Sequence, residues 1–360
     1  MKKKLPLPLW TIVIPILAWI AYFGMSLELG NLYSFVLAAV LIGSVLAAVH
    51  HAEVVAHRVG EPYGTLLLAL AITVIEVALI VSLMLTGGPE TTALARDTVL
   101  AAVMIILTGM IGICLVVGGA RFKEQVFSAQ GVSAALIALT AILVLTLILP
   151  NYTTSTVGPV YTSAQLGFVA IVSLVLYGTF VLVQTVRHRD FFLPPEADGD
   201  EDVHAAPPAK SVALWSALLL LVCLGVVVLL AKALAPDIEL AVVNAGAPKS
   251  LVGVIIAAVV LLPEGLAAYR AAKKNRLQTS LNLAMGSALA SIGLTIPAVA
   301  IVSMVTGMTI TLGIDMKSTV LLLLSLFTIM MSLATGRTNI LQGIVLLVIF
   351  AVYLFTIVAP

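Results

Sequence analysis

Long apolar stretches, repeated along the whole chain, constrain its fold more than any other feature of the sequence. Each stretch is about twenty residues long, which is the length that an α-helix needs to cross the hydrocarbon core of a bilayer. Strands of a membrane barrel would be half as long and would alternate apolar with polar residues. The sequence therefore predicts an all-α, polytopic membrane protein with about eleven transmembrane helices. The predicted spans are 9–27, 31–50, 62–86, 94–118, 132–150, 163–186, 211–234, 250–272, 278–305, 318–335 and 339–358.

Composition agrees with a chain that lipid covers in part. Of the 360 residues, 61% are hydrophobic and 10% are charged, whereas a soluble domain is about half apolar and a quarter charged. The net charge of +1 gives no electrostatic reason to expect binding to nucleic acid. The start, Met-Lys-Lys-Lys, is similar to that of a signal peptide, but no small-residue cleavage site follows the first apolar stretch. We therefore expect that the first helix is retained.

Lys and Arg residues predict the orientation, because cytoplasmic loops of membrane proteins carry an excess of them. With the N-terminus in the cytoplasm, 14 of the 18 basic residues lie in the cytoplasmic tail and loops. The four others are Arg96, Lys232, Lys249 and Lys317. We expect a multi-pass protein of the cell (inner) membrane with a cytoplasmic N-terminus and an outer C-terminus.

One long polar segment, residues 187–210, divides the chain. Its acidic cluster consists of Glu196, Asp198, Asp200, Glu201 and Asp202. With this segment as a cytoplasmic linker, the chain is predicted to contain an extra N-terminal helix (1–30), a first five-helix repeat (31–186) and a second one (211–360). Because five is an odd number of crossings, the repeats would be inverted, as in many transporters that bind their substrate at the repeat interface.

Glu76 and Glu264 differ from the other 15 of the 17 acidic residues, which lie in loops, in linkers or near span ends. These two lie about halfway along the spans 62–86 and 250–272. A charge at the bilayer centre costs roughly 2.5–3.5 kcal/mol on insertion scales, so we expect both glutamates to have a function. Their spans are the second helices of the two repeats, and a pseudo-two-fold axis would bring the carboxylates together.

Two carboxylates in a dehydrated site cannot both be ionised without a compensating charge, so protons and a metal cation compete for them. That competition is what cation/proton exchange requires. Other groups must complete the coordination, because an ion such as Ca²⁺ takes roughly six to eight oxygen ligands. The candidate supporting ligands are Thr73, one turn before Glu76, and Ser287 and Ser291 on the span that follows Glu264.

The segments around the two glutamates resemble those of the calcium/proton exchanger family, in its prokaryotic ChaA-type branch. Similarity to the first-repeat motif of the family rests on Gly60-Glu61-Pro62-Tyr63-Gly64, Leu66-Leu67 and Glu76. Similarity to the second-repeat motif rests on Glu264, Lys274, Gly286-Ser287 and Pro297. Two further matches are Gln184-Thr185 with His188 and Phe192, at the end of the sixth helix, and Gly336 to Gly343. The resemblance extends from about Ala52 to Tyr353.

The resemblance implies that Glu76 and Glu264 bind the cation and that alternating access moves it. It also implies that inward-moving protons drive the cation out of the cell. A third implication is that Glu53 and the acidic segment of the linker lie near the cytoplasmic mouth of the path.

Several amides that are usual in this family are absent from the chain. Thr73 and Leu261 stand where the family has an Asn, Ala290 stands where it has a Gln, and Gly265 stands where a His is frequent. The expected function is therefore export of Ca²⁺ in exchange for H⁺, with exchange of Na⁺ or K⁺ for H⁺ at the same site as the alternative.

Intramembrane enzymes and passive channels are the other classes to compare. A Ser-His protease needs a deep His, an aspartyl protease two deep Asp, and a prenyltransferase Asp-rich motifs at helix ends, and the predicted spans contain none of these. A passive cation channel is the distant alternative, but paired proton-accepting carboxylates favour coupled exchange. No enzymatic activity and no cofactor are expected. The expected partners are the cation, protons and the lipid bilayer, and the sequence leaves the oligomeric state open.

Overall fold

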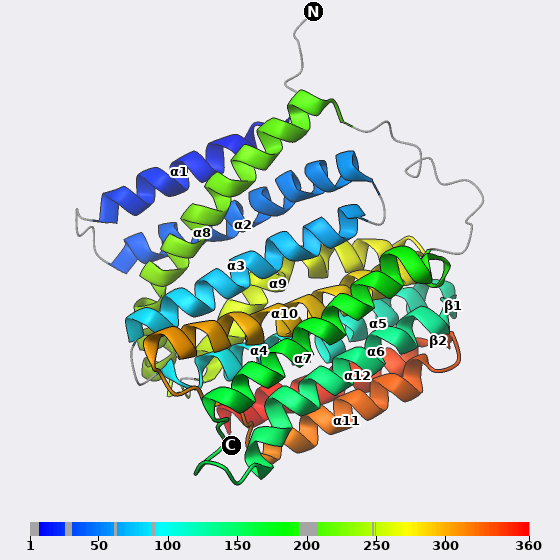
Figure 1. Cartoon of the computed structure of the whole chain (residues 1–360). Helices are drawn as coiled ribbons and strands as arrows, with labels where there is room; N and C mark the ends of the chain where they lie inside the picture. Colours follow the sequence, from blue (N-terminus) through cyan, green and yellow to red (C-terminus); the bar gives the residue numbers. More distant parts are fainter. Residues whose placement is uncertain are drawn as a thin grey trace, which may run out of the picture. The chain divides into compact units, whose positions relative to one another are not determined.

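The computed structural model describes residues 7–25, 31–60, 63–87, 91–193, 208–246, 248 and 250–359 (Figure 1). The chain divides into two compact units, and each unit combines segments from both halves of the sequence. Residues 1–82 and 199–252 form the first unit, and residues 83–198 and 253–360 form the second. The two predicted five-helix repeats are a division by sequence rather than by compactness, and they stay a prediction.

The first unit is a helical group in which α2 packs along α8 and α1 contacts both. Its helices are α1 (Trp10–Gly24), α2 (Asn31–Val59), α8 (Lys210–Asn244) and α3 (Tyr63–Gly87) as far as Ser82. Hydrogen bonds connect these helices: the Tyr33 hydroxyl donates to the Ala21 carbonyl at 2.6 Å, and the Ser34 hydroxyl donates to the Asp237 carboxylate at 2.5 Å.

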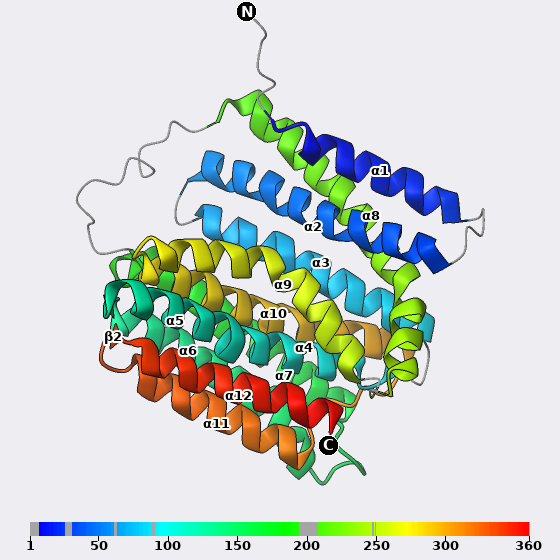
Figure 2. The same cartoon turned by 180° about the vertical axis from the view of Figure 1, so that it is seen from behind.

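The second unit contains the remaining helices, which run side by side in both views (Figures 1 and 2). Helix α10 contacts α4, α5, α6 and α7, while α12 contacts α5 and α11. The α-helices are α4 (Leu94–Met104), α5 (Ile111–Phe122), α6 (Ala129–Leu143), α7 (Ser163–Leu182), α9 (Ser250–Lys273, from Gly253 onward), α10 (Leu277–Thr306), α11 (Met316–Leu333) and α12 (Ile340–Val358). The other elements are the π-helices η3 (Ile105–Met110), η4 (Val144–Ile148) and η6 (Val183–Arg187), the 3-10 helices η5 (Leu149–Tyr152) and η7 (Arg189–Phe191), and the strands β1 (Gln125–Val126) and β2 (Arg337–Thr338).

Every one of the eleven predicted spans falls on a helix, which confirms the all-α, polytopic fold. Within the described residues, nine helices are long and apolar enough to cross a membrane, and the two other apolar stretches are Trp10–Gly24 and Thr73–Leu85 of α3. Large apolar side chains point outward on several of these helices, since Phe35 is 76% exposed and Phe355 is 68% exposed. Apolar surface of this kind is expected where lipid covers the protein.

The predicted end of the second span, at residue 50, was wrong. Helix α2 continues to Val59 and ends before Gly60, whose φ of +83° is a conformation that glycine adopts readily. His51 is therefore a helical residue, fully buried, with its Nε2 atom 3.1 Å from the Thr11 carbonyl of α1. Glu53 also lies within α2, where its side chain is exposed.

The predicted end of the fourth span, at residue 118, was also wrong, because α5 continues through Gly118 and Gly119 to Phe122. The glycines permit close approach instead of a turn. A Cβ atom at Gly118 would collide with Oε1 of Gln125, and one at Gly119 would lie 2.6 Å from the backbone nitrogen of Ile340. Gln125 is held in this position because its Nε2 atom donates to the carbonyl of Ala272 at 3.1 Å and to Oδ1 of Asn275 at 3.0 Å.

Two short backbone pairings join the loops of the second unit. Strands β1 and β2 are antiparallel, with Gln125 opposite Thr338, and they join the α5–α6 connection to the α11–α12 connection. Val160 and Thr311 form an isolated antiparallel bridge that joins the α6–α7 connection to the α10–α11 connection. Exchanging the predicted repeats converts one pairing into the other. This correspondence supports the inverted repeat, which stays a prediction.

Candidate functional site

Glu76 lies on α3 in the first unit, and its side chain is only 4% exposed. Its helical neighbour Thr73, one turn earlier, is 3% exposed. The helix around them is apolar, since Ile75, Leu79 and Ile80 are buried to a similar extent. A carboxylate in such surroundings costs free energy unless a cation, a proton or a set of hydrogen bonds neutralises it.

Glu264 lies on α9 in the second unit, and it is also 4% exposed. Ser287 of α10 donates a hydrogen bond from its hydroxyl to Oε1 of Glu264 at 2.9 Å, so the structure brings these two predicted ligands together. Ser291, one turn further along α10, is 1% exposed. The second unit therefore contains a buried carboxylate with a hydroxyl that orients it.

Two glycines of α9, the helix that carries Glu264, face α4 and η3. A Cβ atom at Gly253 would lie 3.5 Å from the Thr98 hydroxyl of α4, and one at Gly265 would lie 3.5 Å from the Met110 methyl group of η3. Both distances are those of ordinary van der Waals contact. Gly265 directly follows Glu264 and stands where a His is frequent in the family.

Three irregularities occur in the helices of the second unit. Pro263 precedes Glu264 inside α9 and Pro297 lies inside α10, and neither ends its helix. A proline has no N–H, so each leaves the carbonyl four residues earlier without its helical donor. The third is η3, a π-helical segment of Ile105–Met110. Interrupted hydrogen bonding inside a membrane helix is tolerated where the helix lines a cavity or packs on protein, and π segments are frequent at functional sites.

A buried hydroxyl on α10 was missed by the sequence reasoning. Thr295 is fully buried and follows Ser291 by four residues, as Ser291 follows Ser287. Residues with this spacing lie on one face of a helix. The signal was present in the sequence, since extending the same spacing by one step from Ser291 reaches Thr295.

The remaining predicted site residues are those of the cytoplasmic entrance. Glu53 is an exposed residue of α2. Glu196, Asp198, Asp200, Glu201 and Asp202 lie outside the described residues. No group of three or more His, Cys, Asp or Glu side chains that could hold a metal ion occurs in the part of the chain that the structure describes. Glu76 and Glu264 belong to different compact units, so their sharing of one ion stays a prediction.

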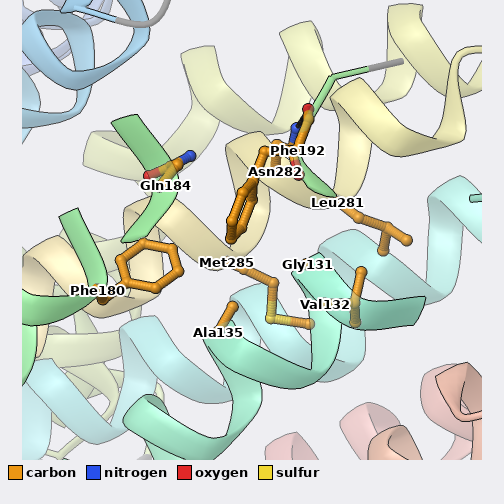
Figure 3. Close-up of a pocket in the computed structure, with 9 residues that line it drawn as sticks. All are labelled: Gly131, Val132, Ala135, Phe180, Gln184, Phe192, Leu281, Asn282 and Met285. Atoms are coloured by element: carbon orange, nitrogen blue, oxygen red, sulfur yellow. Dashed lines mark hydrogen bonds between the residues drawn. The ribbon is translucent and has the colours of Figure 1, made fainter. Parts of the chain in front are cut away.

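Two motif residues that follow α7, Gln184 and Phe192, lie beside α10 (Figure 3). Gln184 and Phe192 line a small pocket together with Asn282 of α10, whose Nδ2 atom donates to the Phe192 carbonyl at 2.5 Å. The rings of Phe180 and Phe192 meet edge to face with centroids 5.8 Å apart. The pocket has no room for a water molecule. These residues therefore fix the segment that follows α7 against α10.

The similarity to known proteins extends over nearly the whole chain. The family model described as sodium/calcium exchanger protein matches residues 29–186 and 215–359. The chain is 46% identical over 361 residues to the protein y4hA of Sinorhizobium fredii (strain NBRC 101917 / NGR234), with 98% of this chain and 97% of that protein covered. It is 35% identical over 355 residues to the sodium-potassium/proton antiporter ChaA of Escherichia coli (strain K12), with 97% and 96% covered.

A solved structure with the same fold is that of the H⁺/Ca²⁺ exchanger CAX. The TM-score is 0.72 at 15% sequence identity, and the alignment covers 96% of this chain and 87% of that one. At this identity the likeness shows the fold.

Proposed function

The chain belongs to the sodium/calcium exchanger family, and on that premise we propose that it is a secondary active cation/proton antiporter that works by alternating access. It is a multi-pass membrane protein, and the relative with 35% identity is itself an antiporter. The proposed activity is transport of a cation and of protons, and we propose no catalytic activity.

The observation that carries this proposal is the burial of Glu264 with the Ser287 hydroxyl directed at its carboxylate. A hydroxyl that donates to a carboxylate oxygen stabilises the ionised form, which is the form that binds a metal cation. Burial has the opposite effect, because it favours the protonated form. Glu264 is therefore placed where a proton and a cation compete closely.

Glu76 provides the second carboxylate in the proposed mechanism. Two buried carboxylates that bind one ion must be neutralised either by that ion or by protons, so the release of one requires the arrival of the other. Thr73, Ser287 and Ser291 supply hydroxyl oxygens to the ion. Glu53 and the acidic residues of the linker attract cations at the cytoplasmic mouth.

Two kinds of cation fit the proposal, one divalent and one monovalent. Ca²⁺ is the first candidate, because two carboxylates offset its double charge and the calcium/proton exchangers have this arrangement of acids. Na⁺ or K⁺ is the second, and a specific observation favours it: the antiporter ChaA, 35% identical to this chain, is a sodium-potassium/proton antiporter. Leu261 and Ala290 are buried and offer no side-chain oxygen, which reduces the number of ligands available to Ca²⁺.

The proposed location is the cell (inner) membrane, with the N-terminus in the cytoplasm and the C-terminus outside. The distribution of Lys and Arg supports this orientation. An inward proton gradient would then export the cation.

Substitution of the two glutamates tests the proposed function. Glu76→Gln and Glu264→Gln keep the shape of each side chain but cannot exchange a proton, so each is expected to abolish exchange. Everted membrane vesicles with an acidic interior and a pH-sensitive dye report proton release when Ca²⁺, Na⁺ or K⁺ is added. Glu124→Gln, the same change at an exposed residue before β1, is the matched control and is expected to leave exchange unchanged.

Retained exchange in either glutamate variant would refute the paired-carboxylate mechanism. Cation flux without proton counterflow in the wild-type protein would identify a passive channel instead. Comparison of the three cations in the same vesicles decides between the divalent and the monovalent substrate.

A further inference from the structure

One face of α10 carries a row of buried hydroxyls. Ser287, Ser291 and Thr295 are 5%, 1% and 0% exposed, and successive members are four residues apart. Side chains with this spacing are neighbours on a helix surface, with Cβ atoms about 5–6 Å apart. The row begins at the hydrogen bond from Ser287 to Glu264 and continues toward the C-terminal end of α10.

The hydroxyl of Thr295 has no hydrogen-bond partner within the described residues. A buried Ser or Thr in a helix ordinarily donates to the carbonyl four residues earlier. Several hydroxyls of this chain make that hydrogen bond. Thr108 donates to Met104, Thr146 to Ile142 and Ser325 to Leu321, all at 2.5–2.7 Å. Thr295 departs from this pattern at a fully buried position.

Distance separates Thr295 from the carboxylate of the second unit. Eight residues of α-helix lie between Ser287 and Thr295, which corresponds to about 12 Å along the axis. Oxygen ligands lie about 2.3–2.6 Å from a bound Ca²⁺, so one ion cannot contact both hydroxyls. Ser291 lies between them and divides the interval into two steps of about 6 Å.

We propose that Thr295 is an outer cation-binding residue, the last buried oxygen of a hydroxyl row through which the ion passes between Glu264 and the C-terminal end of α10. The inference rests on the proposed function, because it extends the path of the transported cation. Thr295 is neutral, so it replaces one water of a partly hydrated, hard cation and leaves charge neutralisation to the carboxylates. The distribution of basic residues places this end of α10 outside the cell.

Replacement of the Thr295 hydroxyl by a methyl group tests the inference. Thr295→Val removes the oxygen at nearly constant shape, and Thr295→Ser retains it. Thr146→Val on α6 is the matched control, because Thr146 is equally buried and its hydroxyl donates to its own helix. Each purified protein is placed in proteoliposomes, and the apparent KM for Ca²⁺, Na⁺ and K⁺ is measured from each face. The melting temperature is measured with and without the same cations.

Thr295→Val is expected to raise the KM for the transported cation at least threefold at the outer face, while Thr295→Ser and Thr146→Val remain within twofold of the wild-type protein. Its melting temperature without cation is expected to equal or exceed that of the wild type, because no hydrogen bond is lost. A purely structural Thr295 would instead lower that temperature. A KM equal to the wild-type value at both faces would overturn the inference.

Failure of the proposed function and failure of this inference give different results. If the wild-type protein exchanges no cation for protons, the proposed function has failed. The cation-dependent rise in melting temperature still tests Thr295, because it requires binding alone. A titration curve of Thr295→Val that coincides with the wild-type curve then overturns the inference.

Discussion

Ser287 shows how a single side chain prepares a buried carboxylate for a cation. Its hydroxyl donates to Oε1 of Glu264 at 2.9 Å, across the contact between α9 and α10. The sequence suggested Ser287 as a supporting ligand on the span that follows Glu264. It could not predict the donor and acceptor, since a helical serine can equally donate to its own backbone.

Removal of the Ser287 hydroxyl should weaken cation binding without abolishing exchange. Hydrogen bonds to charged groups contribute about 1.5–3 kcal/mol, and each 1.4 kcal/mol is about tenfold in affinity. Ser287→Ala is therefore expected to raise the apparent KM for the cation about tenfold or more, with the largest effect at low pH, where protons compete best. Ser287→Thr retains the hydroxyl and serves as the control. Equal KM values for Ser287→Ala and the wild-type protein would show that the hydrogen bond does not assist binding.

At the scale of helices, hydropathy predicted that each span exists but misplaced several of its ends. The reason is visible at α2, which continues beyond residue 50 because Ala52, Glu53 and Arg58 are good helix formers and no Gly or Pro interrupts the helix before Gly60. Helix α8 likewise continues through Pro236 to Asn244. Hydropathy detects where an apolar stretch of sequence ends, whereas a helix ends where the backbone conformation changes.

The predicted end of the fourth span, at residue 118, is a second error of this kind. A Gly-Gly pair is typical both of turns and of close helix packing, and the sequence alone does not distinguish them. At Gly118 the structure favours packing, since Gln125 fills the space that a side chain would need. That choice depends on a residue seven positions later and on Ala272 and Asn275, both far away in sequence. The residues near Gly118 in the sequence contain no information on these contacts of Gln125.

Gly118→Ala should consequently destabilise the second unit. The new methyl group collides with Oε1 of Gln125 and displaces the side chain that bonds to Ala272 and Asn275. Overpacking of this kind costs about 1–3 kcal/mol, and a lower melting temperature in detergent would reveal it. Gly178→Ala in α7 is the control, because nothing lies within 4 Å of the added atom. Equal melting temperatures for the two variants would contradict this account of Gly118.

For the whole molecule, the sequence predicted an all-α, polytopic membrane fold and a family of exchangers, and the structure and the comparisons confirm both. It could not predict how the spans group into compact units, because each unit combines helices from both predicted repeats. The predicted sharing of one ion by Glu76 and Glu264 depends on how the two units assemble. Glu76 and Glu264 were selected by depth alone, and the structure adds the surroundings of each residue separately.

Deletion of residues 196–202 tests the role of the acidic linker. If its carboxylates attract cations to the cytoplasmic mouth, the deletion should raise the apparent KM for the cation at that face severalfold, more at low than at high ionic strength, because salt screens exposed charges. Replacement of the same segment by an uncharged Gly-Ser segment of equal length controls for its length. An unchanged salt dependence would identify the segment as a solvated connection.

The short pairings at the two ends of the second unit have a consequence for how a passage could open. Gln125 and Val126 are fastened to Thr338 and Arg337 at one end, and Val160 is fastened to Thr311 at the other. Separating the helices at either end would break these backbone pairings between the connecting segments. We therefore expect these helices to stay clamped together throughout the cycle, with the moving elements found elsewhere in the chain.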